Sequence, residues 1–205
     1  MTRTAHGAAA MPALPSAALL CAVLVGVLRP ADLAAQLDGA IPSMPLASGT
    51  LSFDGHATVG DFTGTTTTMT GEMTGGESLA AVRGWVEAPV KTLDTGDGKR
   101  DKDLNKSMES SKHPTMRFEL TGVTPAGQPA DTAAVALRGK LTLHGVTRDV
   151  ALPGRVWKAG DALRLRGDFP LDLGDYEIGG LSKMLGMLRM QEGIEVHVDL
   201  TFAPR

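Results

Sequence analysis

The histidines that follow residue 35 are the first candidates for chemistry in this sequence, and their spacing limits what they can do. His56, His113, His144 and His197 lie far apart along the chain. A zinc site usually shows at least one close pair of ligands, and the histidines offer none. The motifs of serine hydrolases, zinc proteases and nucleotide-binding loops are also absent. The sequence therefore predicts histidines on polar faces and in turns, with no catalytic residue, no metal and no cofactor.

Four aspartates in a short segment raise the question of a calcium site, namely Asp94, Asp97, Asp101 and Asp103. An EF-hand loop places its ligands at alternate positions and ends on a distal glutamate. This segment lacks both features, and lysine and arginine residues lie between the aspartates. It is predicted to be a solvated turn that leads into a capped helix.

Alternation of apolar and polar residues is the dominant pattern of the chain and predicts half-buried strands. It is strongest at 82–88, 116–121, 135–143, 163–173 and 194–202, and weaker at 49–57, 62–74 and 148–157. Short turns rich in glycine, proline and aspartate separate about eight such strands. Long one-sided antiparallel strands in sequence order favour a closed sheet, because closure removes exposed edges. We therefore expect an all-β, antiparallel up-and-down barrel of about eight strands.

Two segments depart from this alternation and are expected to be short helices in connections. Residues 101–111 place Leu104 and Met108 four apart, and residues 181–190 carry apolar residues at helical spacing. The second segment is rich in methionine, whose flexible side chain adapts to varied apolar shapes. It is either a helix packed on one end of the barrel or an adaptable lid, and both interpretations stay open.

The interior of the expected barrel is the remaining candidate site. Eight strands enclose a space that side chains can just fill, or that holds one small ligand. Gly84, Gly139 and Gly167 fall in mid-strand on the apolar face, which favours a cavity, although glycines that let strands coil would produce the same pattern. An apolar tunnel without charges suits an isoprenoid or fatty-acyl chain. The expected lining residues are Val82, Val86, Met116, Phe118, Leu120, Leu137, Leu141, Leu143, Leu163, Leu165, Phe169, Met184, Leu188, Val196 and Val198.

The N-terminus is expected to be an export signal. Residues 17–28 form an uninterrupted apolar run, shorter than the roughly 20 residues that a transmembrane helix needs. We expect residues 1–35 to be a signal peptide, residues 36–48 a lead-in segment and residues 49–205 the barrel domain. Cys21, the only cysteine, lies inside the apolar run, so the exported chain would fold without disulfides. A periplasmic or secreted location follows, with no membrane span in the mature chain.

Composition restricts the class of partner. The chain has 205 residues, a formal net charge of −3 and 42% hydrophobic residues, which excludes most disordered and fibrous classes. A nucleic-acid-binding protein would show a basic surplus, and none is present. The length fits one domain, and a homodimer is compatible with the sequence.

Several motifs give the sequence a resemblance to a known family. The most specific is GKLTLHGVTR at residues 139–148, supported by residues 59–64 (VGDFTG), residues 90–96 (VKTLDTG) and His113-Pro114. With these motifs the chain resembles the YceI-like proteins, which are exported, lipocalin-like barrels that bind polyisoprenoids or other long-chain lipids. Residues 104–109 (LNKSME) are more polar than the corresponding family stretch. The resemblance implies lipid carriage without catalysis, and this departure bears on which lipid is carried.

Three functions follow from these observations. The first is an exported carrier, without chemistry of its own, that holds a long-chain apolar lipid inside the barrel. The second is an envelope structural or interaction protein with a solid barrel core. The third is a hydrolase or isomerase that uses His56 and His144. We expect His144 to be structural instead, because it precedes Gly145 at a strand end, where an imidazole can hold a turn by hydrogen bonding to the backbone.

Overall fold

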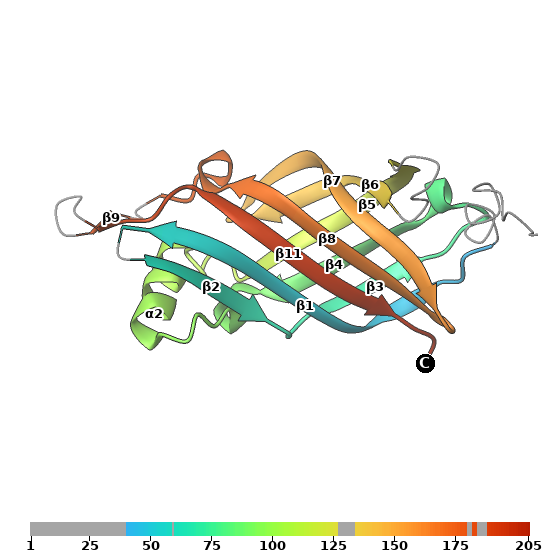
Figure 1. The fold of residues 1–205 in the computed structure, drawn as a ribbon, viewed down its shortest axis with the longest axis horizontal. Coiled ribbons are helices and arrows are strands. Elements are labelled where there is room, and N and C mark those ends of the chain that lie inside the picture. Colours follow the sequence, from blue (N-terminus) through green and yellow to red (C-terminus); the bar gives the residue numbers. More distant parts are fainter. Residues whose placement is uncertain (1–39, 59, 127–133, 180–181, 184–187) are drawn as a thin grey trace, which may run out of the picture.

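The alternating segments form the strands of a closed antiparallel barrel (Figure 1). A computed structural model describes residues 40–205, except 59, 127–133, 180–181 and 184–187. The expected signal peptide, residues 1–35, lies outside these described residues. The strands are β1 (Met44–Ala57), β2 (Gly60–Thr66), β3 (Thr70–Thr74), β4 (Arg83–Pro89), β5 (Thr115–Pro125), β6 (Ala134–Leu143), β7 (Val146–Ala159), β8 (Ala162–Asp172), β9 (Ser182–Lys183), β10 (Leu188–Arg189) and β11 (Gly193–Phe202).

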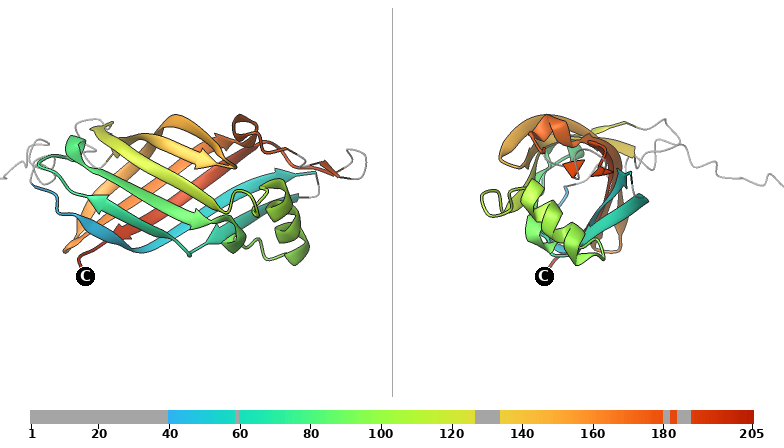
Figure 2. Two further views of the ribbon diagram at one scale, coloured as in Figure 1. Left: turned by 180° about the vertical axis from the view of Figure 1, so that it is seen from behind. Right: turned by 90° about the vertical axis from the view of Figure 1, so that its left-hand side faces the viewer.

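Pairing between the first and last long strands closes the barrel. Within the described chain, β1, β3, β4, β5, β6, β7, β8 and β11 form the ring, with β11 paired to both β8 and β1. The view along the barrel axis shows this ring directly (Figure 2). Strand β2 lies outside the ring and pairs with the second half of β1. The expected barrel architecture is therefore confirmed.

Two boundaries at the start of the barrel differ from the sequence prediction. Strand β1 begins at Met44, inside the expected lead-in segment 36–48, and Met44 pairs with Met73 of β3. The threonine-rich stretch 62–74, expected as one strand, contains parts of β2 and β3. Threonine is common in strands, so the composition of this stretch did not reveal the break between β2 and β3.

One of the two expected helices is present. Helix α2 (Gly98–Ser107) begins three residues before the predicted position, because Asp97 is its N-cap and accepts hydrogen bonds from the backbone N–H groups of Lys99 and Arg100 at 2.8 and 3.1 Å. The prediction of a helix at residues 181–190 is wrong for the two ends of this segment that the structure describes. There Ser182–Lys183 and Leu188–Arg189 pair as the two-stranded β9–β10 ladder. Residues 184–187, and with them Met184 and Met187, lie outside the described residues.

The buried apolar residues form two clusters, one at each end of the barrel. The cluster far from α2 includes Met44 and Leu163, at the starts of β1 and β8, and Phe202, at the end of β11. The cluster beside α2 includes Phe53 and Phe169. Within the described ranges, no helix is long and apolar enough to cross a membrane.

The turn between β6 and β7 fixes the position of His144. His144 and Gly145 have φ angles of 52° and 79°, and the flanking Leu143 and Val146 are paired, so these two residues form a tight hairpin turn. His144 Nδ1 lies 3.1 Å from the backbone carbonyl oxygen of Tyr176, to which it donates a hydrogen bond. The expected contact between this imidazole and the backbone is confirmed.

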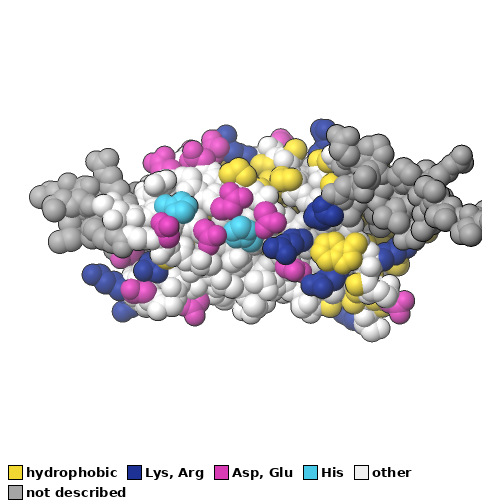
Figure 3. Space-filling model, in the orientation of Figure 1, with side chains coloured by type: hydrophobic (Ala, Val, Ile, Leu, Met, Phe, Trp, Pro, Cys, Tyr) yellow, Lys and Arg dark blue, Asp and Glu magenta, His cyan; other side chains and the backbone are white. Residues whose placement is uncertain are grey.

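The outer face of the barrel carries histidine and acidic side chains close together (Figure 3). His197 Nδ1 lies 2.6 Å from Asp168 and its Nε2 lies 3.1 Å from Asp54. The hydrogen bonds with Asp168 and Asp54 raise the pKa of His197 above its ordinary value. The pKa of Asp54 is lowered, first by the hydrogen bond from Thr63 and then by that with His197. This histidine is expected to be part of a charged cross-strand network.

Candidate functional site: an apolar cavity inside the barrel

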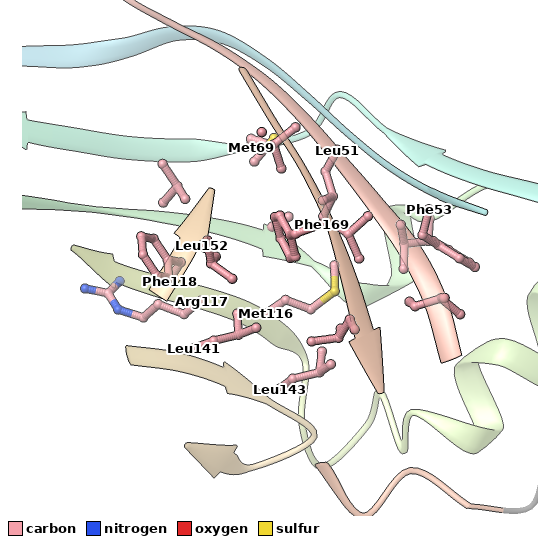
Figure 4. Close-up of a pocket in the computed structure, with 18 of the residues that line it drawn as sticks. Leu51, Phe53, Met69, Met116, Arg117, Phe118, Leu141, Leu143, Leu152 and Phe169 are labelled. Atoms are coloured by element: carbon pink, nitrogen blue, oxygen red, sulfur yellow. The ribbon is translucent and has the colours of Figure 1, made fainter. Parts of the chain in front are cut away.

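A cavity of about 490 Å³ lies inside the barrel between the two buried clusters. Figure 4 shows Leu51, Met116, Phe118, Leu141 and Phe169 around it, contributed by strands on all sides. A volume of several hundred Å³ is typical of a ligand pocket. The barrel therefore holds a cavity and is not a solid core.

Residues in the middle of the strands are less buried than those at the barrel ends. Leu51, Phe118, Leu141, Leu165 and Val198 are only partly buried, although all of them line the interior. Their neighbours across the ladders are also interior residues, as with Phe118 opposite Leu141 and Leu51 opposite Val198. These side chains have room beside them because they face the cavity. Their apolar surface is available to an apolar ligand.

Two of the mid-strand glycines, Gly84 and Gly139, allow neighbouring strands to approach closely, and this explains their presence better than added cavity volume does. A Cβ atom on Gly84 would lie 2.6 Å from the carbonyl oxygen of Glu72 on the neighbouring strand. A Cβ on Gly139 would overlap the carbonyl oxygen of Glu119 and the ring of Phe118. Both glycines therefore let adjacent strands coil tightly, which was the second of the two interpretations that the sequence left open.

Charged residues approach the cavity at its α2 end. The guanidinium of Arg100 lies 4.5 Å from the centre of the Phe62 ring, and this ring meets Phe53 edge-on at 6.0 Å between centroids. Arg100 also donates a hydrogen bond to the carbonyl oxygen of Thr95 at 3.3 Å. The backbone N–H groups of Arg100 and Lys99 lower the pKa of Asp97 below its ordinary value. This end combines aromatic rings with charged groups. The lining as a whole is mainly apolar, although it also includes charged residues on β3, β4 and β5, such as Glu72, Arg83 and Arg117.

The chemistry of the described lining is suited to holding an apolar molecule. Of the described residues that line the cavity, none is a histidine or a cysteine. His56 lies beside Asp61 at the β1–β2 hairpin, with 2.8 Å between its Nδ1 and the carboxylate. His144 lies in the β6–β7 turn. These two histidines, proposed together as a catalytic alternative, are held in separate hairpins by different partners.

All the expected lining residues whose side chains are described do line the cavity. They are Val82, Val86, Met116, Phe118, Leu120, Leu137, Leu141, Leu143, Leu163, Leu165, Phe169, Val196 and Val198. Met184 and the side chain of Leu188 lie outside the described part of the structure. Contact between these residues and a lipid stays a prediction.

The structure adds lining residues that the sequence analysis did not select. Leu51 and Phe53 come from β1, and Leu104 and Met108 from α2 and its C-cap. The alternation of Leu51 and Phe53 with polar residues was available in the sequence. The spacing of Leu104 and Met108 indicated a helix face but not the surface that it covers, which depends on the fold of the connection across the barrel end.

Comparisons with known proteins match this chain to one protein family and to several curated relatives. The model of the YceI-like domain family matches residues 45–202. A UPF0312 protein of Pseudomonas aeruginosa is 32% identical over 117 residues, which cover 51% of this chain and 59% of that protein. A UPF0312 protein of Azotobacter vinelandii is 30% identical over 123 residues, covering 56% and 60%. These matches span less than two thirds of the relatives' length.

Solved structures share the fold at low sequence identity. BcnA of Burkholderia cenocepacia superposes with a TM-score of 0.64 at 16% identity, covering 75% of this chain and 95% of BcnA. A polyisoprenoid binding domain from Saccharophagus degradans, described as implicated in plant cell wall breakdown, gives a TM-score of 0.62 at 13% identity, covering 78% and 98%. Similarity at this level establishes the fold alone.

Proposed function

Because this chain belongs to the YceI-like family, we propose that it is a non-enzymatic carrier that holds a long-chain apolar lipid inside its barrel. A polyisoprenoid or a similar chain is the ligand class that we favour. The observation that carries the proposal is the mainly apolar cavity of about 490 Å³ inside the barrel. The structural relative from Saccharophagus degradans, named as a polyisoprenoid binding domain, supports the same ligand class.

Burial of hydrocarbon supplies the binding free energy in this proposal. Each methylene that leaves water contributes about 0.8 kcal/mol, so roughly ten buried carbons contribute about 8 kcal/mol before the losses of motion on binding. The cavity wall consists mainly of apolar side chains such as Leu, Val, Met and Phe, which offer dispersion contacts along the chain but few hydrogen bonds. Selection is therefore expected to depend on chain length and shape more than on polar groups.

Export is a second part of the proposal. We infer that residues 1–35 are removed as a signal peptide and that the carrier acts in the periplasm or after secretion. The support is the short apolar run at residues 17–28. A carrier outside the cytoplasm would shield a water-insoluble chain as it moves through an aqueous compartment.

The alternative of an interaction protein with a solid core receives less support. A solid barrel would fill its centre with side chains, whereas here the mid-strand residues are partly exposed to an interior cavity. Carriage of a ligand explains this exposure directly.

Native mass spectrometry tests the proposal. The purified protein is measured as isolated and after delipidation and incubation with a long-chain polyprenol, with a saturated fatty acid for comparison. We expect a single adduct of polyprenol per chain that disappears when the protein is denatured. A delipidated protein that takes up neither compound would contradict the proposal.

A further inference from the structure

Two histidines and one carboxylate converge just outside the cavity wall, at the α2 end of the barrel. Glu109 and His113 lie in the connection from α2 to β5, and His144 lies in the β6–β7 turn. We propose that these three side chains bind a divalent transition-metal ion of the Zn²⁺ class. The site is independent of the lipid cavity, because its ligand atoms belong to a different set of residues.

The distances between the ligand atoms suit one ion. His144 Nε2 lies 3.8 Å from Glu109 Oε2, and His113 Nε2 lies 4.0 Å from the same oxygen. All three residues offer ligand atoms within 4.8 Å of one another. Zinc takes nitrogen and oxygen ligands at about 2.0–2.2 Å in tetrahedral geometry, so two ligands on one ion lie roughly 3.3–3.6 Å apart. The observed separations are longer by roughly half an ångström, and a small rotation of the exposed Glu109 side chain would shorten them.

His144 is oriented as a metal ligand. Its Nδ1–H donates to the carbonyl oxygen of Tyr176, which leaves the lone pair on Nε2. This Nε2 is buried and has no hydrogen-bond partner within the described part of the chain. A ligating histidine generally uses its second nitrogen in this way, donating it to a carbonyl or carboxylate. A buried nitrogen acceptor without a partner normally costs stability, and a bound cation would satisfy it.

Backbone geometry places the other two ligands against His144. Glu109 has a φ of 44°, a left-handed conformation that carries the chain away from the end of α2. The His113 ring packs onto Gly145, where a Cβ atom would lie 2.5 Å from His113 Cε1. The two imidazole rings meet at 5.0 Å between centroids with 66° between their planes. The glycine of the turn therefore makes room for the second histidine.

Lys112 is the present partner of Glu109 and would be displaced. Lys112 Nζ lies 3.0 Å from Glu109 Oε2, and this lysine side chain is 71% exposed. Its hydrogen bond is the first cause of the lowered pKa of Glu109, with smaller contributions from His144 and His113. Exposed ion pairs contribute little to stability, so replacing Lys112 by a divalent ion costs little free energy. The carboxylate is 43% exposed, which gives an ion access from solvent.

The sequence contained a signal for this cluster. Glu109 and His113 are four residues apart, which is a close ligand pair formed by one carboxylate and one histidine. The prediction of no close pair considered the histidines alone and is corrected on this point. His144 could not be added from spacing, because it lies in a different hairpin.

Metal binding would hold the barrel end together. Met108 and Leu143 precede Glu109 and His144 in the chain, and both line the cavity. An ion on the three ligands would therefore join the α2–β5 connection to the β6–β7 turn directly beside the cavity wall. We expect it to raise the melting temperature of the protein.

Competition titration with a chromophoric zinc chelator tests the proposal on purified protein carrying no histidine tag. After treatment with EDTA and dialysis, we expect one Zn²⁺ per chain to bind and the melting temperature to rise. Glu109→Gln and His113→Ala are each expected to weaken Zn²⁺ binding at least tenfold and to remove the rise in melting temperature. Both variants retain the turn contact of His144, so they are expected to fold.

His56→Ala is the matched control, because His56 is also an exposed histidine beside a carboxylate, Asp61 at 2.8 Å. It is expected to bind Zn²⁺ like the wild type. Melting of each variant in EDTA reports folding separately from metal binding. The proposal is overturned if the wild type takes up no Zn²⁺, if Glu109→Gln and His113→Ala bind it as tightly as the wild type, or if His56→Ala loses it equally.

Discussion

A carboxylate placed inside the barrel should empty it of lipid, and Val198 is the best position for this test. Val198 lines the cavity in the middle of β11, and its ladder partners are Leu51 on β1 and Gly167 on β8. Neither partner can supply a positive charge. Leu141 is a poorer position, because Arg148 lies opposite it on β7. Val198→Glu therefore introduces a charge without a cross-strand partner.

The cost of Val198→Glu follows from the protonation of the new carboxyl. An ordinary glutamate has a pKa of about 4.3, so neutralising it at pH 7 costs about 3.7 kcal/mol, and at pH 5 only about 1 kcal/mol. Loss of the apolar side chain adds roughly 1 kcal/mol. The free energy of unfolding should fall by about 4–5 kcal/mol at pH 7, or by less if water enters the cavity beside the carboxylate. Lipid is excluded in either case.

Thr201→Glu is the matched control. Thr201 lies on the same strand, faces outward and is opposite Arg164, so the new carboxylate meets water and an opposite charge. We expect its free energy of unfolding to change by at most about 1 kcal/mol, with lipid content unchanged. Urea unfolding followed by tryptophan fluorescence, together with quantification of extracted lipid at pH 7 and pH 5, measures both effects. If Val198→Glu at pH 7 has the same lipid content and the same free energy of unfolding as the wild type, position 198 does not face the cavity.

Four further predictions follow from named contacts. Gly139→Ala should lower the free energy of unfolding by about 1–3 kcal/mol, because its Cβ meets a neighbouring backbone, whereas Gly122→Ala, with open space around it, should cost at most about 0.5 kcal/mol in urea unfolding. His197 has a raised pKa in the folded state, so its stabilising contribution is complete below about pH 6.5 and is lost as the pH rises through the folded pKa. The stability difference between wild type and His197→Ala should accordingly be larger at pH 5.5 than at pH 9, and a difference independent of pH would refute the proposed network. His144→Ala in metal-free protein should cost about 1 kcal/mol while polyprenol binding persists, and loss of binding with unchanged melting would reverse this assignment. N-terminal sequencing of protein recovered outside the cytoplasm should show that residues 1–35 are absent, and a chain beginning at Met1 would contradict export with cleavage.

The barrel and its inner face could be predicted because their determinants are local. Strict alternation, as in 194–202, places Val196 and Val198 on one face whatever the rest of the chain does. The short β9–β10 pair could not be predicted, since Ser182–Lys183 and Leu188–Arg189 lie in a segment with apolar residues at helical spacing. Tertiary pairing there prevailed over local periodicity.

The Glu109, His113 and His144 cluster marks a different limit of sequence reasoning. Its members meet only when the α2–β5 connection folds against the β6–β7 turn. No periodicity reports such a contact between distant segments. The role of the glycines was also undecided in the sequence, because it depends on how closely two strands approach, as Gly139 and Glu119 do.

Photo-crosslinking with a diazirine-bearing polyprenol tests the central claim most directly. The account predicts that peptide mapping of delipidated protein loaded with this probe places the label on inward residues such as Leu51, Phe118 and Val198, and that excess unmodified polyprenol suppresses it. Labelling confined to outward residues such as Lys140, or labelling that polyprenol does not suppress, would contradict lipid carriage inside the barrel.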